Sequence, residues 1–308
     1  MKPLPYIEPN QWHHRFINRV TCWYIASFQK PVVPIEVPQQ VHSPVWITGF
    51  FRSGTSLVTR MMNELGFDTG PAAHLLQPTG TRKMLNPDGF FENFLFMEWS
   101  LYAFHQMNAW GHLPPPPAQV QLFSFNPYER KKFIEFSVCG VHDDRISNRK
   151  KADVLRKYDY RSLINYVDDN FQKKCVLKNP HFSLLYPLLF KSWPDSTMLV
   201  CFRNPASAIA SAKQVAPQLT SEIYAKYYQT LLEIPEEKIT FFSYDQLVSD
   251  PEKSVRLLAQ KFNANEQQLK NALACFNVEL VRHQKENADV DTVARRIYEQ
   301  LKSRAINK

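Results

Sequence analysis

One stretch decides the fold class of this 308-residue chain: Val45-Trp46-Ile47-Thr48-Gly49-Phe50-Phe51-Arg52-Ser53-Gly54-Thr55-Ser56. Its apolar beginning predicts a buried strand over 45–50, and the following residues predict a helix over 56–65 that ends before Gly66. A strand that leads through a glycine turn into a helix directs free backbone N–H groups and the positive helix end toward one point. Because this arrangement binds anions, the loop is a candidate ligand site with five candidate residues: Arg52, Ser53, Gly54, Thr55 and Ser56.

The loop has the glycine spacing of a Walker A phosphate-binding loop but lacks the lysine of that motif. In a nucleoside-triphosphate enzyme, the lysine after the second glycine reaches the β- and γ-phosphates. Thr55 occupies that position here, and the cation of the loop is Arg52. The loop therefore predicts phosphate binding but argues against an ATP-dependent phosphotransferase.

A second candidate anion site follows the strand predicted over 198–202, which ends at Arg203. Pro205 suits the opening of the next helix, and Ser211 lies eight residues after Arg203, two turns into that helix. A Walker B strand would instead end in an acid that carries magnesium. The competing acid is Asp245, after the strand predicted over 239–243, and we interpret it as a helix N-cap.

Together these two anchors resemble those of the sulfotransferases that use 3′-phosphoadenosine 5′-phosphosulfate (PAPS). Residues 52–56 resemble the family's 5′-phosphosulfate loop, and Arg203 with Ser211 resembles its 3′-phosphate motif. Three further segments are similar to the family, the last of them to its bacterial members: 177–180, 242–251 and 86–93. The resemblance covers residues 44 to 285. Leu57 departs from it, since many cytosolic animal members carry a tryptophan there that stacks on adenine.

The resemblance implies transfer of a sulfuryl group from PAPS to a hydroxyl, in line and without a metal ion. Arg52 would contact the bridging and 5′-phosphate oxygens, and Lys178 the sulfuryl oxygens. Charge that develops on these oxygens is stabilised by fixed cations and N–H donors, at about 3–4 kcal/mol for one such group. Tyr244 resembles a family position near the adenine; its alternative interpretation is an aromatic residue of the core at a strand end.

The acceptor hydroxyl must lose its proton, so the site needs a general base. Glu92, between flanking aromatic residues, is one candidate, and the bacterial resemblance implies an acid there. His181 is the other candidate, because histidine titrates near neutrality and this residue follows Lys178 closely. The sequence leaves the choice open, and His181 has the alternative of capping the helix predicted over 182–191.

The alternation of strands and helices predicts an α/β, P-loop-like three-layer fold, with a central parallel sheet flanked by helices. We divide the chain into an N-terminal arm, 1–43, and a single sulfotransferase-like domain, 44–308, with a helical insertion over the sheet edge at about 95–172. Ligands of such sheets bind at the carboxyl ends of the strands, where Arg52, Lys178 and Arg203 are expected.

The net charge of +8 is concentrated in residues 101–200, which hold 14 basic and 9 acidic residues. A basic cluster in this part predicts a solvated helix face or an electropositive entrance for an anionic substrate: Arg145, Arg149, Lys150, Lys151, Arg156 and Lys157. No nucleic-acid-binding module accompanies the cluster, so we expect no nucleic-acid partner.

The five cysteines are scattered, which predicts reduced, mostly buried thiols, and no histidine pair has metal-ligand spacing. We therefore expect no metal. No apolar run is long enough for a membrane span or a secretory signal, and we expect a cytoplasmic enzyme. The alternatives are a P-loop ATP-dependent phosphotransferase and a catalytically silent nucleotide-binding protein of the same fold. The sequence identifies neither the acceptor (carbohydrate, lipid or other small alcohol) nor the oligomeric state.

Overall fold

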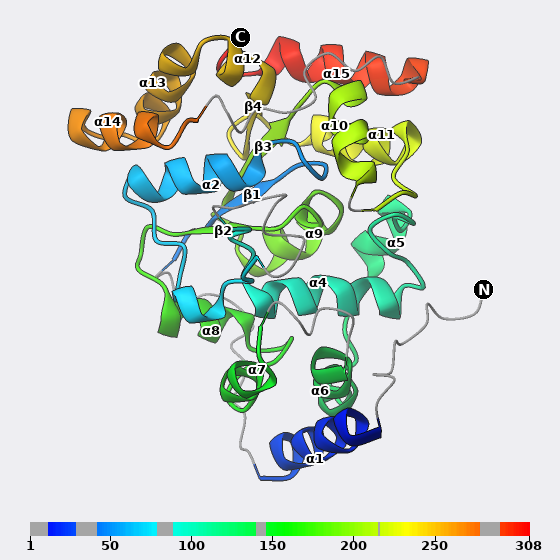
Figure 1. Cartoon of the computed structure of the whole chain (residues 1–308). Coiled ribbons are helices and arrows are strands. Elements are labelled where there is room, and N and C mark those ends of the chain that lie inside the picture. The colour runs from blue at the N-terminus through cyan, green and yellow to red at the C-terminus, as the bar shows by residue number, and fades with distance from the viewer. Residues whose placement is uncertain (1–11, 29–41, 79–88, 140–145, 215, 278–289) are drawn as a thin grey trace.

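The computed structural model describes residues 12–28, 42–78, 89–139, 146–214, 216–277 and 290–308 (Figure 1). Much of the predicted N-terminal arm, residues 86–88 of one similar segment, and Arg145 lie outside the described residues. Four strands form the sheet: β1 (Val45–Thr48), β2 (Val176–Lys178), β3 (Thr197–Phe202) and β4 (Ile239–Ser243).

Helices precede and follow the strands of this sheet, and the described ranges include two short 3₁₀ helices. Before β2 lie α1 (Trp12–Phe28), α2 (Thr55–Glu64), η1 (Ala72–His74), α4 (Phe94–Gln106), α5 (Pro117–Leu122), α6 (Arg130–Cys139), α7 (Asn148–Leu155) and α8 (Leu163–Asn170). After β2 lie α9 (Phe182–Ser192), α10 (Pro205–Lys213), α11 (Ser221–Gln229), η3 (Thr230–Glu233), α12 (Tyr244–Ser249), α13 (Pro251–Lys261), α14 (Glu266–Ala274) and α15 (Thr292–Arg304).

The four strands are parallel and lie in the order β2-β1-β3-β4. Their side chains alternate between two cores, as the period of two of a strand requires. On β1, Ile47 packs with α2, α13 and α14, whereas Trp46 packs with α4 and α9 on the opposite face. Helices thus cover both faces of the sheet, which confirms the predicted α/β three-layer architecture.

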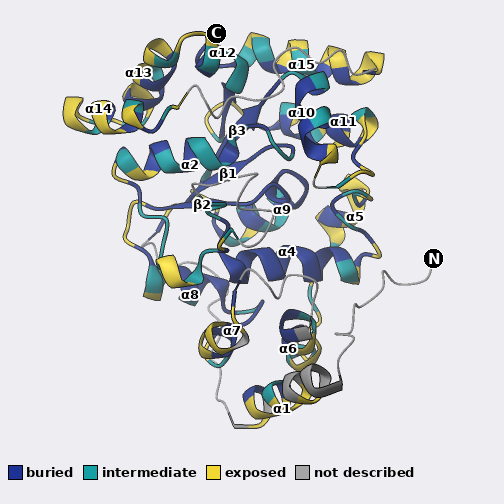
Figure 2. Cartoon of the chain, viewed as in Figure 1, coloured by how far each residue is buried: buried dark blue, intermediate teal, exposed yellow. Residues whose placement is uncertain are grey.

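The described residues of the insertion predicted at about 95–172 are mostly helical, as expected, and the segment between α2 and β2 lies beside the β2 edge of the sheet. Asp68 and Glu92 form isolated parallel bridges with Cys175 and Lys178, at the two ends of β2. Helix α4 is buried along most of its length (Figure 2), because its neighbours on this side are other helices and not solvent. The chain therefore brings Glu92 to the carboxyl end of β2.

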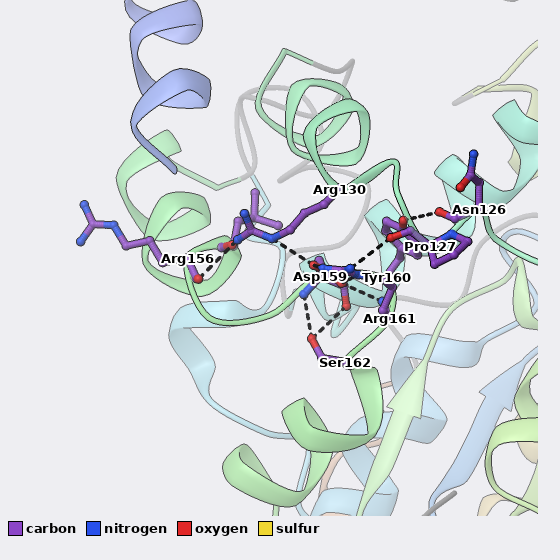
Figure 3. A network of polar contacts seen from close by, with 9 residues as sticks. Asn126, Pro127, Arg130, Arg156, Asp159, Tyr160, Arg161 and Ser162 are labelled. Atoms are coloured by element: carbon purple, nitrogen blue, oxygen red, sulfur yellow. Dashed lines mark hydrogen bonds and ion pairs between the residues drawn. The ribbon is translucent and has the colours of Figure 1, made fainter. Parts of the chain in front are cut away.

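A polar network around Asp159 holds the insertion together (Figure 3). The carboxylate of Asp159 is fully buried and accepts hydrogen bonds from Arg130 Nε, at 3.0 Å, and Arg161 Nη2, at 2.7 Å. Arg130 also donates to the carbonyl oxygen of Leu155, the last residue of α7. The two arginines thus share one buried carboxylate inside the insertion.

The predicted solvated face is wrong for one residue of the basic cluster. Lys151 is fully buried, donates to the carbonyl oxygen of Ser137 at 2.9 Å, and lies 3.7 Å from the carboxylate of Glu98. Its neighbours Arg149 and Lys150 are exposed, because successive helix positions point about 100° apart. The cysteines follow the prediction of burial, since the four whose side chains are described are buried: Cys22, Cys175, Cys201 and Cys275.

Candidate active site

The loop between β1 and α2 is held in place by the hydroxyl group of Tyr228 on α11. This hydroxyl lies 2.8 Å from the backbone nitrogen of Phe50 and 3.1 Å from Ser53 Oγ, and it donates to the carbonyl oxygen of Cys201 on β3 at 3.0 Å. The loop is therefore fixed to the neighbouring strand before any ligand binds. Tyr228 was not among the predicted site residues, because nothing in its local sequence pattern marks it.

The backbone of the loop bends through left-handed conformations at Arg52, with φ 64°, and at Gly54, with φ 84°. Gly54 is the N-cap residue of α2, and no side chain caps the first turn. The N–H groups of this turn are thus oriented toward the loop without a capping oxygen, which is the arrangement that binds anions. A Cβ atom on Gly54 would lie 2.3 Å from Cδ2 of Tyr244, so only glycine fits here without displacing that ring.

The two predicted anion anchors lie in one place. Arg52 Nε donates a hydrogen bond of 3.2 Å to Ser211 Oγ, which joins the loop after β1 to α10, the helix after β3. Arg203 is buried at the carboxyl end of β3, and its guanidinium carbon lies 4.9 Å from the ring centroid of Tyr244 at the end of β4. The ring of Tyr244 therefore lies close to both Gly54 and Arg203.

Lys178 and Glu92 form a buried ion pair at the carboxyl end of β2, with Nζ and Oε1 2.5 Å apart. Lys178 Nζ also donates to the carbonyl oxygen of Phe90 at 3.0 Å and to Ser56 Oγ at 3.3 Å. Burial lowers the pKa of Lys178, the field of Arg52 lowers it further, and Glu92 opposes both. The carboxyl end of β2 thus brings together the ammonium of Lys178, the carboxylate of Glu92 and the hydroxyl of Ser56.

The second carboxylate oxygen of Glu92, Oε2, is buried without a hydrogen-bond partner in the part of the chain that the structure describes. A buried acceptor atom left unsatisfied costs free energy, so its presence indicates a site where a ligand donates a hydrogen bond. Glu92 therefore has one oxygen on Lys178 and one available to a donor.

His181, the other candidate base, lies among aromatic side chains. Its ring centroid is 5.1 Å from that of Phe104 and 5.6 Å from that of Phe51, and a Cβ atom on Gly111 would lie 2.8 Å from its Nε2. His181 occupies the N-cap position of α9 without a side-chain capping bond. Of the two candidate bases, Glu92 is thus the one that contacts Lys178.

The interpretation of Asp245 as a helix cap is wrong. Ser243 caps α12, whereas Asp245 Oδ2 accepts hydrogen bonds from the backbone nitrogen of Asn204, at 2.7 Å, and from the hydroxyl of Tyr298, at 2.8 Å. Burial raises the pKa of Asp245. Among the residues that the structure describes, no group of three His, Cys, Asp or Glu side chains is placed to hold a metal ion.

A model of the sulfotransferase family matches residues 44–267. The chain belongs to the sulfotransferase family. A sulfotransferase moves a sulfuryl group from a donor to an acceptor. The family match covers the residues of all four strand ends.

Solved structures of sulfotransferases are similar to this sulfotransferase over most of its length. The sulfotransferase domain of the olefin synthase of Synechococcus PCC 7002 is 14% identical, with a TM-score of 0.46, covering 88% of this chain and 98% of that one. The sulfotransferase domain of the curacin biosynthetic pathway is 15% identical, with a TM-score of 0.42, covering 86% and 99%. Sulfotransferase STF1 of Mycobacterium tuberculosis H37Rv is 14% identical, with a TM-score of 0.40, covering 85% and 77%.

A comparison with curated proteins found no match to this sulfotransferase. Within the described ranges, none of its helices has both the length and the apolar character that crossing a bilayer requires.

Proposed function

We propose that this sulfotransferase transfers the sulfuryl group of PAPS to a hydroxyl group of a carbohydrate, lipid or other small alcohol, without a metal ion. The observation that supports this proposal most directly is the hydrogen bond between Arg52 and Ser211. It joins the two predicted phosphate anchors, which are far apart in the sequence, into one site. A nucleotide with phosphates on both its 5′ and 3′ sides matches two such anchors.

Each residue of the site has a proposed binding role. The N–H groups at the start of α2, with Arg52, Ser53, Thr55 and Ser56, hold the 5′ side of the nucleotide. A separate pair, Arg203 with Ser211, holds the 3′-phosphate, and Tyr244 supports the guanidinium of Arg203 and lies near the adenine. Leu57, where many cytosolic animal members carry a tryptophan, is half-buried and packs against the core, so it does not replace that residue.

The donor supplies an activated sulfuryl group, and its transfer to the acceptor oxygen releases 3′,5′-bisphosphoadenosine. Glu92 is the proposed general base, because its Oε2 is the buried oxygen available to a hydroxyl donor. When Glu92 takes the proton of the acceptor, its negative charge no longer offsets Lys178. The positive field of Lys178 at the site then rises as negative charge develops there. His181 is the alternative base.

Calorimetric titration with 3′,5′-bisphosphoadenosine, in buffer that contains a chelator of divalent ions, tests the donor class. We expect binding under these conditions, and weaker binding of AMP, which has no 3′-phosphate. Binding of Mg·ATP with no binding of the bisphosphate would instead indicate the P-loop phosphotransferase.

Mass spectrometry of a cell extract incubated with PAPS and the protein tests the reaction itself. We expect at least one metabolite with a hydroxyl group to gain the mass of a sulfuryl group. A protein that binds the bisphosphate but modifies no metabolite, and releases no bisphosphate from PAPS, would be the catalytically silent alternative.

A further inference from the structure

Helix α11 carries three fully buried tyrosines, Tyr224, Tyr227 and Tyr228. They are three and four positions apart, and this spacing places their side chains on one face of the helix. Burial raises the pKa of each hydroxyl group above its ordinary value of 10.0. Each hydroxyl therefore keeps its proton near neutral pH and remains a hydrogen-bond donor inside the molecule.

Tyr228 fixes the start of the loop after β1 to the end of β3. Its hydroxyl donates to the carbonyl oxygen of Cys201 at 3.0 Å and accepts from the backbone nitrogen of Phe50 at 2.8 Å. A Cβ atom on Gly49 would lie 2.0 Å from that carbonyl oxygen and 3.4 Å from the hydroxyl oxygen, so only glycine fits there. The loop that carries Arg52 is therefore held by a side chain from a distant helix.

Tyr224 lies one helical turn before Tyr228 and fixes the residue that follows β3. Its hydroxyl donates to the carbonyl oxygen of Arg203 at 2.8 Å. The N–H of the same peptide group, which belongs to Asn204, donates to Asp245 Oδ2 at 2.7 Å. Both polar atoms of the peptide group after Arg203 thus have a side-chain partner, and these partners fix the backbone from which the guanidinium extends.

One helix thus holds the backbone at both proposed phosphate anchors. The ring centroids of Tyr224 and Tyr228 are 4.8 Å apart, and that of Phe50 lies 5.3 Å from that of Tyr224. Helix α11 also contacts α10, which carries Ser211, and Figure 1 shows the two helices side by side. Because a packed interior resists displacement, the two tyrosines fix the separation of the anchors before a ligand binds.

We propose that Tyr224 and Tyr228 are positioning residues for the nucleotide, with Tyr228 holding the loop of the 5′ side and Tyr224 holding the anchor of the 3′-phosphate. This inference rests on the proposed function, which assigns these two sides to Arg52 and Arg203. Neither hydroxyl is assigned a contact with the ligand, because each acts through the backbone that it holds. Donors that are fixed in advance bind an anion more tightly, since binding does not have to order them.

Tyr227 provides a matched control on the same helix. It is equally buried, and its hydroxyl donates to the carbonyl oxygen of Gly111 at 3.1 Å, in a segment that carries neither phosphate anchor. A change from tyrosine to phenylalanine removes one hydroxyl at each of the three positions and keeps the ring. Each variant leaves a buried carbonyl oxygen without this donor, so all three should lose stability. Ligand affinity separates a positioning role from a merely structural one.

Calorimetric titration with 3′,5′-bisphosphoadenosine is the first measurement. Tyr228→Phe should weaken binding about tenfold, because Phe50 and Ser53 in the loop lose their hydrogen-bond partner. Tyr224→Phe should weaken binding about threefold to tenfold, because one hydrogen bond to the backbone of the 3′ anchor is lost. Tyr227→Phe should bind the bisphosphate as the unchanged protein does.

Two adenosine monophosphates then distinguish the two ends of the nucleotide. Each is titrated as a competitor of the bisphosphate, so that weak binding can be measured. Tyr228→Phe should weaken binding of 5′-AMP and leave that of 3′-AMP unchanged, whereas Tyr224→Phe should weaken binding of 3′-AMP and leave that of 5′-AMP unchanged. A merely structural role would change the two affinities in the same proportion or not at all.

Three results would overturn the proposal. They are unchanged bisphosphate affinity in both Tyr224→Phe and Tyr228→Phe, an equal loss of affinity in these variants and in Tyr227→Phe, and the same ratio of 5′-AMP to 3′-AMP affinity in all proteins. Each of them leaves the proposed function intact, since the unchanged protein still binds the bisphosphate. Absence of bisphosphate binding by the unchanged protein would instead overturn the proposed function and this inference with it.

Discussion

The carboxyl end of β2 and the carboxyl ends of β3 and β4 both hold a buried cation and a carboxylate, but they arrange them differently. At β2, the ammonium of Lys178 pairs directly with Glu92. At β3 and β4, Asp245 accepts from the neutral donors of Asn204 and Tyr298, while the guanidinium of Arg203 lies over the ring of Tyr244.

The two arrangements suit two different tasks of an anion site, the transfer of a group and the binding of a ligand. A cation already neutralised by a base exerts its full field only when the base takes a proton, which suits the end where a group is transferred. A guanidinium supported by an aromatic ring presents its charge whether or not any proton moves, which suits the end where a ligand is held.

The largest effect on turnover and stability is expected from breaking the ion pair between Lys178 and Glu92. Glu92→Gln should lower turnover about 10²–10⁴-fold, the contribution of a general base. It should also lower the free energy of unfolding by about 3–5 kcal/mol, because Lys178 keeps a buried charge without its anion. Turnover of the acceptor and denaturation by urea measure the two effects.

The double variant Glu92→Gln/Lys178→Met is the control for this pair. It should recover most of the lost stability, because neither charge is left alone, but none of the lost turnover. Full turnover in Glu92→Gln would show that Glu92 is not the general base. The turnover of His181→Ala would then test the alternative base.

At the other end, Gly54→Ala tests whether the ring of Tyr244 determines the binding geometry. The new Cβ would meet that ring at 2.3 Å, so overpacking should cost about 1–3 kcal/mol in addition to the strain of a left-handed alanine. The affinity for 3′,5′-bisphosphoadenosine should fall together with stability, because the ring of Tyr244 supports Arg203. Calorimetry and thermal denaturation measure both quantities.

Gly89→Ala provides a matched comparison, since Gly89 also has a positive φ, of 97°, but no atom lies within 4 Å of the position that a Cβ would take there. Gly89→Ala should lower the free energy of unfolding through backbone strain alone, by about 1–2 kcal/mol. Equal losses of stability in the two variants would mean that the contact with Tyr244 does not constrain the loop.

Arg203→Ala should weaken binding of 3′,5′-bisphosphoadenosine by about 1.5–3 kcal/mol, the value of hydrogen bonds to a charged group. Its effect on AMP should be small, because AMP lacks the 3′-phosphate. Arg52→Ala should instead weaken both ligands, since Arg52 is assigned to the 5′ side. Equal weakening of both ligands in Arg203→Ala would remove its 3′-phosphate role.

The smallest effect concerns the pH dependence of stability through Asp245. Its pKa is raised above the ordinary 3.8, so the folded state retains a proton that the unfolded state has already lost. The contribution of Asp245 to stability is therefore lost as the pH rises from 3.8 through the folded pKa. Asp245→Asn keeps an acceptor oxygen for Asn204 and Tyr298 and removes this loss.

Urea denaturation at a series of pH values measures that effect as the difference between the two proteins. The free energy of unfolding of the variant should increase relative to that of the unchanged protein as the pH rises, by about 1.4 kcal/mol for each unit of pKa shift. A difference that does not change with pH would show that Asp245 has the same pKa in the folded and unfolded states.

Local patterns in the sequence predict the parallel sheet and the helices well, because strand and helix periods are local properties. The strand over 239–243 has the predicted bounds, and α9 differs from its prediction by one residue. The N-cap of α12 was predicted at Asp245, two residues after Ser243, which caps the helix. Lys151 was expected in solvent, since its partner Glu98 lies on another helix and no local pattern connects the two.

The candidate site was predicted as a set of residues but not as a set of contacts. That Lys178 pairs with Glu92, and that the hydroxyl of Tyr228 fixes the loop, are properties of the packed chain. No spacing or composition encodes which side chain a buried lysine meets, because that depends on how distant segments are brought together.

The contacts that build the site connect parts of the chain that are very far apart. Lys178 and Glu92 are separated by 86 residues, Arg52 and Ser211 by 159, and Phe50 and Tyr228 by 178. Contacts of such long sequence separation form late and slow the folding of a chain, because large loops must close first. The proposed nucleotide site is thus complete only when almost the entire polypeptide has reached its final arrangement, and no short fragment of the chain contains all of its contacts.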